Sequence, residues 1–154
     1  MSARPRLALS LIVFACLVAL PATFAHAKGH PGGSTGGGGA GIQLTPEAVV
    51  PGPGEMGALA SAVISVNHGE VCFAITVSGL ADKITEIALY QAPVGQAGPK
   101  VLRLTPSPIG LFQLKDCVPA DASLVRSIQR DPSAYYVQIS TQAYSNGALR
   151  GQLQ

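Results

Sequence analysis

The side chains best suited to chemistry in this sequence are a small set of aromatic and polar residues in its C-terminal half. Tyr136, Gln138 and Ser140 alternate with apolar residues, so a strand through this segment places all three on one face. Tyr90 joins that face if its own strand is the neighbour, and Arg150 lies in a further short strand. Tyrosine and arginine are enriched where proteins bind one another. The set therefore predicts a binding surface, an aromatic-polar patch.

Arg150 has two interpretations that the sequence leaves open. It stands between Leu149 and Gly151 in a predicted strand. An arginine in such a position commonly points outward into solvent or forms an ion pair with a nearby acid. In the sharper interpretation, the guanidinium faces a ligand together with the tyrosines.

Catalytic chemistry finds little support. His68 is the one histidine of the predicted folded part, it falls in a predicted turn, and no G-x-S-x-G motif occurs within residues 42–154, so a serine-hydrolase triad is not expected. The acidic residues are scattered. Glu86 shares its predicted strand face with Ala88 and Tyr90, which leaves no second carboxylate for glycosidase-type work. We therefore expect no catalytic residue, no metal site and no cofactor.

The N-terminal 27 residues have the layout of a secretory signal peptide. Arg4 and Arg6 precede an apolar run over residues 7–20, and Ala25 and Ala27 are small residues at the positions that a signal peptidase reads. The run is shorter than the roughly 20 residues of a membrane span. We predict a signal peptide over residues 1–27 and a secreted or periplasmic chain without a membrane span. A cut after Ala25 and an envelope anchor retained by an uncleaved signal are the alternatives.

Two cysteines, Cys72 and Cys117, follow the predicted signal. An exported chain meets an oxidising environment, in which two lone thiols usually pair. The closed loop would run from Phe73 to Asp116, and chain-entropy reasoning assigns such a cross-link roughly 4 kcal/mol. No C-x-x-C spacing favours a redox or metal-binding thiol pair. We therefore predict a structural disulfide.

Charge excludes one class of partner. The sequence has ten Lys and Arg and eight Asp and Glu, and the predicted signal removes Arg4 and Arg6 but no acid, so the exported chain is balanced. Nucleic-acid binding needs a clustered basic excess, so no nucleic-acid partner is expected. Glycine dominates residues 28–41, which predict a disordered linker, and residues 42–154 predict one β domain.

Short alternating segments separated by turn signals fill this domain. Strands are predicted over residues 59–66, 71–77, 84–91, 100–104, 109–117 and 148–153, with another through Tyr135, Val137 and Ile139. Asp121 is predicted to cap the one expected helix, which ends before Pro132. Many short strands favour an all-β Greek-key sandwich or barrel with one short helix.

The order and spacing of six segments resemble the CHRD domain, a module named after chordin and common in exported bacterial proteins. The resemblance covers residues 42–153 and rests on V-V-P-G-P-G-E (49–55), E-V-C-F-A-I-T-V-S-G-L (70–80), G-Q-A-G-P (95–99), D-C-V (116–118), D-P-S-A-Y-Y-V-Q-I-S-T (131–141) and G-A-L-R-G-Q-L (147–153). It implies an immunoglobulin-like β-barrel outside the cytoplasm, in a small bacterial-type member without an established activity.

The resemblance also bears on Ser140. Family members typically carry histidine there, in a Y-Y-V-N-V-H pattern, and H-I-H where this chain has Ala88-Leu89-Tyr90. Two histidines two apart on a strand point the same way and could form a metal site with a third. Because Ala88, Tyr90 and Ser140 lack an imidazole, a superoxide-dismutase-like metal protein or enzyme is the disfavoured alternative. The favoured expectation is a non-catalytic binding or structural module whose partner is an unknown protein or envelope ligand.

Overall fold

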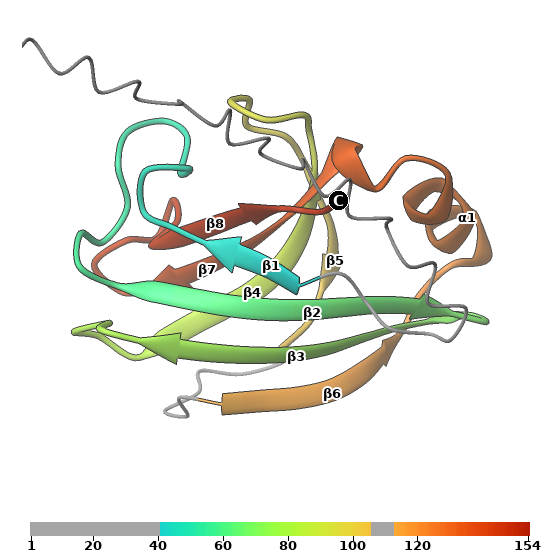
Figure 1. Cartoon of the computed structure of the whole chain (residues 1–154), viewed down its shortest axis with the longest axis horizontal. Coiled ribbons are helices and arrows are strands. Elements are labelled where there is room, and N and C mark those ends of the chain that lie inside the picture. The colour runs from blue at the N-terminus through green and yellow to red at the C-terminus, as the bar shows by residue number, and fades with distance from the viewer. Residues whose placement is uncertain (1–40, 106–112) are drawn as a thin grey trace, which may run out of the picture. The chain divides into compact units, whose positions relative to one another are not determined.

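The computed structural model describes residues 41–105 and 113–154, which form two four-stranded antiparallel sheets (Figure 1). The first sheet has the strand order β1 (Gly41–Leu44), β2 (Leu59–Asn67), β3 (Glu70–Ser78) and β6 (Gln113–Pro119). The second has the order β5 (Lys100–Arg103), β4 (Ile84–Gln91), β7 (Tyr135–Thr141) and β8 (Leu149–Gln152). The helix α1 (Ala122–Arg130) and a 3₁₀ turn (Pro132–Ala134) connect β6 to β7.

The strand order is that of an immunoglobulin-like sandwich. β3 pairs with β6 and β4 pairs with β7, although neither pair is consecutive in the chain, because the chain crosses between the sheets after β3, β5 and β6. Immunoglobulin domains pair their B and E strands and their C and F strands in the same way. The predicted all-β, immunoglobulin-like Greek-key sandwich with one short helix is confirmed.

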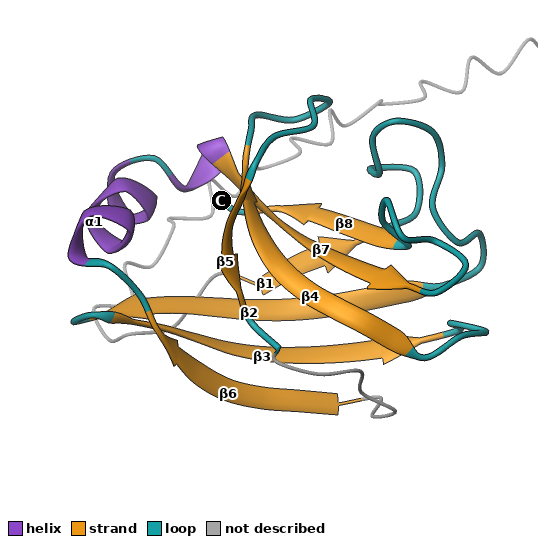
Figure 2. Cartoon of the chain, turned by 180° about the vertical axis from the view of Figure 1, so that it is seen from behind, coloured by secondary structure: helices purple, strands orange, loops and turns teal. Residues whose placement is uncertain are grey.

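One side of the sandwich is closed by backbone hydrogen bonds. The N–H of Thr45, directly after β1, donates to the carbonyl oxygen of Arg150 in β8 at 2.9 Å, and the N–H of Arg150 donates back at 3.1 Å. The two sheets are thereby joined between β1 and β8. Figure 2 shows the second sheet from its other side, with β4 between β5 and β7.

The core lies between the two sheets and is mainly aliphatic. Period-two alternation brings one face of each strand inward, and each inward side chain loses its contact with water. The central members of the core are Ala62, Ile64, Val71, Phe73, Ile75, Ile87, Leu89, Val137, Ile139 and Leu149. The aliphatic character follows from a sequence with no Trp and only four Phe and four Tyr.

β7 departs from the half-buried pattern of the other strands. All seven of its residues are buried, so both of its faces are covered. The inward face contributes Val137 and Ile139 to the core, whereas the outward face holds the polar residues singled out by the sequence. Loops must therefore cover the outer face of β7, and that face positions the candidate site.

Several element boundaries refine the sequence predictions. Gly41, placed in the predicted linker, is the first residue of β1, a strand that the sequence did not indicate. Asp121 stands at the N-cap position of α1, but its side chain makes no capping hydrogen bond. The predicted signal peptide (1–27), residues 28–40 of the predicted linker and the start of the strand predicted over 109–117 lie outside the described residues. Within the described ranges, no helix is long and apolar enough to cross a membrane.

Candidate functional site

The outer face of the second sheet brings the five predicted binding residues together. In the register of β4 and β7, Tyr90 lies directly opposite Tyr136, and in that of β7 and β8, Arg150 lies directly opposite Gln138. Ser140 follows two positions along β7, on the same face. The pairing of β4 with β7 therefore places Tyr90 beside Tyr136, as the sequence interpretation required.

Exposure of these residues differs from the expectation of an open surface. Tyr136, Gln138, Ser140 and Arg150 are 2%, 6%, 5% and 1% exposed, and only Tyr90 is partly exposed. The physical reason is that neighbouring turns bond directly to the side chains: the side-chain amide of Gln138, for example, donates to a backbone oxygen in the β7–β8 turn at 3.2 Å. The five residues do lie together, but four of them are buried beneath the surface rather than exposed on it.

An aromatic-cation stack runs across β4, β7 and β8 on this face. The rings of Tyr90 and Tyr136 are nearly parallel, with centroids 5.1 Å apart and an interplanar angle of 10°. The Arg150 guanidinium carbon lies 3.5 Å from the centroid of the Tyr136 ring. Because β4 and β8 flank β7, the Tyr136 ring lies between the other two groups. Such stacking and cation-π contact each contribute about 1 kcal/mol, and the latter about 2 kcal/mol when desolvated.

Arg150 neither reaches solvent nor pairs with an acid, which corrects the more ordinary interpretation of this residue. Its Nη1 donates to the carbonyl oxygen of Gln96 at 2.7 Å, and its Nη2 donates to that of Pro93 at 3.2 Å. Burial lowers the pKa of Arg150, and Tyr136 opposes that shift. Guanidinium pKa values start high enough for the group to stay charged. A buried cation thus binds two loop carbonyl groups.

Those two carbonyl groups are the ends of a single β-turn, which we call the clamped turn (Pro93–Gln96). The N–H of Gln96 donates to the carbonyl oxygen of Pro93 at 3.2 Å, and Gly95 has a φ of 76° at the third position. A positive φ at this position defines a type II turn and favours glycine. Arg150 holds the first and last residues of the turn from beneath.

Further contacts fix the rest of the β4–β5 loop. The side-chain amide of Gln152 donates to the carbonyl oxygen of Ala92 at 2.9 Å, and the N–H of Gly98 donates to the Tyr136 hydroxyl at 3.3 Å. A Cβ at Gly98 would lie 1.9 Å from the backbone oxygen of Gln91, so only glycine fits there. The loop is held along its whole length.

Val94 occupies the second position of the clamped turn and is 74% exposed. It is the most exposed large apolar side chain among those of the described residues. The sequence interpretation placed Pro93–Pro99 in a loop but did not single out Val94. The signal that could have found it is Gly95, because a glycine two residues after Pro93 favours a type II turn with Val94 at its tip.

An ion-pair cluster lies beside the exposed edge of Tyr90. Lys100 Nζ contacts both Glu86 carboxylate oxygens, at 2.6 and 2.8 Å, and Arg103 Nε contacts one of them at 3.0 Å. Burial alone would raise the pKa of Glu86, but the hydrogen bonds from Lys100 and Arg103 outweigh it and lower that pKa. Burial, Glu86 and Tyr136 together raise the pKa of Tyr90. The cluster carries two cations and one carboxylate.

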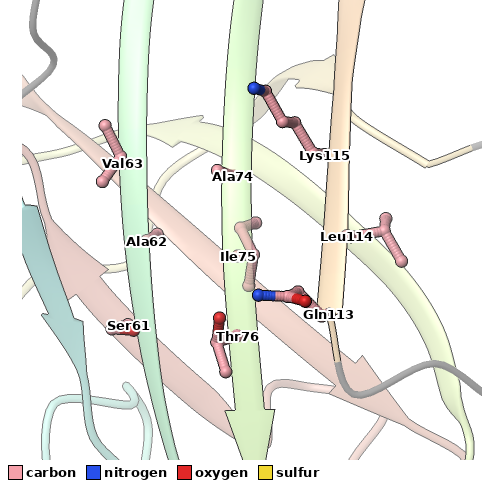
Figure 3. A pocket seen from close by; sticks show the side chains of 9 residues that line it. All are labelled: Ser61, Ala62, Val63, Ala74, Ile75, Thr76, Gln113, Leu114 and Lys115. Carbon is pink, nitrogen blue, oxygen red and sulfur yellow. The ribbon is translucent and has the colours of Figure 1, made fainter.

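The first sheet holds the predicted disulfide and a shallow hollow. Cys72 and Cys117 are bonded across β3 and β6, which confirms the predicted pair. A hollow of about 440 Å³ lies over β2, β3 and β6, and Figure 3 shows Val63, Ala74 and Lys115 on the three strands around it. None of the five predicted binding residues reaches this hollow. His68 is exposed at the β2–β3 turn, where the sequence placed it.

Comparison with known proteins decides the family. The model of the CHRD domain matches residues 40–153, the whole of the described β domain. This chain belongs to the CHRD domain family. No curated protein and no solved structure matches the chain. Membership in the CHRD family supports, at most, a non-catalytic extracellular module, and the disulfide is compatible with secretion.

The three positions that the family resemblance singled out, Ala88, Tyr90 and Ser140, lie on the outer face of the second sheet. Ala88 lies directly opposite Gln138, and Ser140 lies directly opposite Glu86, on the same face as Tyr90. Ala88 is fully buried and Ser140 is 5% exposed. In this CHRD domain the same face carries the stacked tyrosine pair and Arg150. The side chains at the three positions offer one phenol, one hydroxyl and one methyl group, which is a poor ligand set for a transition metal.

Proposed function

We propose that this CHRD domain is an exported, non-catalytic binding module that presents the clamped turn to an extracytoplasmic partner. One observation carries the proposal: a fully buried arginine holds both ends of a turn whose tip residue, Val94, is exposed. The predicted signal peptide, the disulfide and the family support export. The absence of imidazole at Ala88, Tyr90 and Ser140 supports a role without a catalytic metal.

Burying Arg150 costs the fold free energy. Removing an ion of this size from water costs several kcal/mol, and an apolar residue of similar volume would often serve the fold equally well. A buried arginine without an acidic partner therefore lowers the stability that the fold could have. This loss is explained if the turn must keep one conformation, because a preordered loop does not lose conformational entropy when it binds.

The exposed groups indicate the chemistry of the partner. Val94 offers an apolar tip, and Tyr90 offers a partly exposed side chain whose ring stacks on Tyr136. Lys100 and Arg103 outnumber Glu86 beside that ring. We infer a partner protein or envelope component with an apolar pocket for Val94 and an acidic rim.

Photocrosslinking from defined positions tests the proposed surface. A photoreactive amino acid replaces Val94 in one variant and Leu59, which is 53% exposed on the first sheet, in a matched control. In the native host, position 94 should give a discrete adduct that excess unlabelled chain suppresses. Equal or absent labelling from the two positions would contradict the proposal.

Cell fractionation and the mass of the N-terminus test the export part separately. We expect the chain in the secreted or periplasmic fraction, beginning near Lys28. A chain found only in the cytoplasm with its first 27 residues intact would contradict export without touching the role of the clamped turn.

A further inference from the structure

Three potential metal ligands gather on the outer face of the first sheet, whereas the clamped turn belongs to the second sheet. Glu70 and Cys72 stand two apart in β3 and therefore point the same way, and Cys117 lies directly opposite Cys72 in β6. Their carboxylate oxygen and two sulfur atoms all lie within 4.8 Å of one another. Among the described residues, this is the one such group of three.

The two sulfur atoms stay close even without the bond between them. Cys72 and Cys117 occupy register partners in an antiparallel pair, with Cα atoms 3.9 Å apart. The neighbouring pairs, Val71 with Val118 and Phe73 with Asp116, continue the ladder on both sides. Opening the disulfide lets the two sulfur atoms move apart to non-bonded contact, but the strands keep the two thiols on neighbouring positions of the same sheet face.

Glu70 is available as the third ligand. Within residues 41–105 and 113–154, no hydrogen bond or ion pair engages its carboxylate, and the ion pairs found there all involve Glu86. The other nearby acid, Asp116, already accepts a hydrogen bond from the N–H of Cys117 at 2.8 Å. Glu70 and Cys117 are exposed, so a hydrated cation reaches them directly.

We propose that the dithiol form of this domain binds one zinc-like divalent cation through Cys72, Cys117 and Glu70, with water as the fourth ligand. Two thiolates and a carboxylate are zinc ligands, and zinc sites are usually tetrahedral. Binding releases two protons, one from each thiol, as two metal–sulfur bonds form, and it transfers no electrons. The disulfide form cannot bind in this way, because both thiolates are consumed in the S–S bond.

Metal binding and disulfide formation therefore compete for the same two sulfur atoms. The dithiol exists before the chain is oxidised, and it is restored when a dithiol reductant donates two electrons and two protons and is itself converted to a disulfide. The cation would hold β3 and β6 together in the form that lacks the covalent link. This inference does not rest on the clamped turn, so the two proposals fail independently.

Cobalt titration tests the site, because Co²⁺ replaces Zn²⁺ in such sites and is coloured. The full chain is reduced with a phosphine and titrated with Co²⁺ without oxygen. We expect sulfur-to-cobalt charge-transfer and tetrahedral d–d bands that saturate at one Co²⁺ per chain and vanish on adding Zn²⁺. The oxidised chain should give neither band.

Variants separate a built site from two adventitious thiols. Glu70→Gln should weaken Co²⁺ binding about tenfold or more, whereas Glu47→Gln, an exposed acid elsewhere, should leave it unchanged. Reduced wild-type chain without the bands overturns the proposal. Equal Co²⁺ affinity of Glu70→Gln and the wild type also overturns it. This criterion applies even if reduction loosens the fold, because the thiols of an unfolded chain would bind Co²⁺ whether or not Glu70 is present.

Discussion

Replacing Arg150 by methionine should loosen the clamped turn more than any other part of the domain. Methionine keeps an unbranched apolar stem but is shorter and cannot donate to the carbonyl oxygens of Pro93 and Gln96. The variant loses two hydrogen bonds of 2.7 and 3.2 Å from a charged donor and the cation-π contact with Tyr136. The carbonyl oxygen of Pro93 then keeps only the N–H of Gln96 as its donor, and the carbonyl oxygen of Gln96 loses its contact with Arg150.

The size of the effect follows from opposing contributions. Two hydrogen bonds from a charged group contribute about 3–6 kcal/mol together, and a desolvated cation-π contact contributes about 2 kcal/mol. Leaving the guanidinium out of the interior returns several kcal/mol of desolvation cost. We expect a net loss of about 2 kcal/mol, and that loss corresponds to about a thirtyfold change in an equilibrium constant.

Amide hydrogen exchange measures this loss at the turn itself. The N–H of Gln96 bonds to Pro93 within the turn, so its exchange reports local opening. It should exchange about thirtyfold faster in Arg150→Met than in the wild type. The N–H of Val137, in the core strand β7, should change much less.

Arg103→Met is the matched control. It removes an arginine from the same sheet face, but the Arg103 side chain is 53% exposed and its partner is Glu86. Exposed ion pairs contribute about 0–1 kcal/mol, so exchange at Gln96 should stay close to that of the wild type. Unchanged exchange at Gln96 in Arg150→Met, or equal acceleration in both variants, would refute the account of the clamp.

Three further predictions concern the scaffold. Serine at both Cys72 and Cys117 should lower the free energy of unfolding by roughly 4 kcal/mol, measured by urea denaturation. An unchanged midpoint would show that the disulfide does not stabilise the fold. Because the folded pKa of Glu86 is lowered, its stabilising contribution is present above the unfolded pKa of about 4.3 and is lost as pH falls through the folded value. The melting temperature should therefore fall less steeply with acid pH in Glu86→Gln than in the wild type, as thermal unfolding would measure. Gly98→Ala should destabilise by more than about 2 kcal/mol because its Cβ would overlap a backbone oxygen, whereas Gly41→Ala, with nothing within 4 Å, should be nearly neutral in thermal unfolding.

Much of the fold could be predicted because its signals are local. The strand predicted over residues 84–91 has the bounds of β4, and the alternation around Phe73 predicts β3 within a residue at each end. β1 could not be found in this way. It has four residues, next to a glycine-rich segment, and its pairing with β2 and the bridge from Thr45 to Arg150 are contacts between distant parts of the chain.

The sequence predicts which residues make up the candidate site, but it does not predict how exposed they are. The two-residue period gave the common face of Tyr136 and Gln138, and pairing of β4 with β7 added Tyr90. Nothing local shows that Arg150 is buried, because its partners in the clamped turn lie 54 and 57 residues earlier in the chain. A charged residue between apolar neighbours is predicted to face solvent, because the local sequence does not show which loop covers it.

The most direct test of the central claim is competition for the adduct formed from position 94. Unlabelled wild-type chain and Arg126→Met, which removes an exposed arginine on α1, should suppress that adduct at similar concentrations. Arg150→Met should need about thirtyfold more, since it keeps Val94 but loses the fixed turn, and Val94→Asp should not compete. If Arg150→Met and Val94→Asp compete as well as the wild type, the clamped turn is not the binding element.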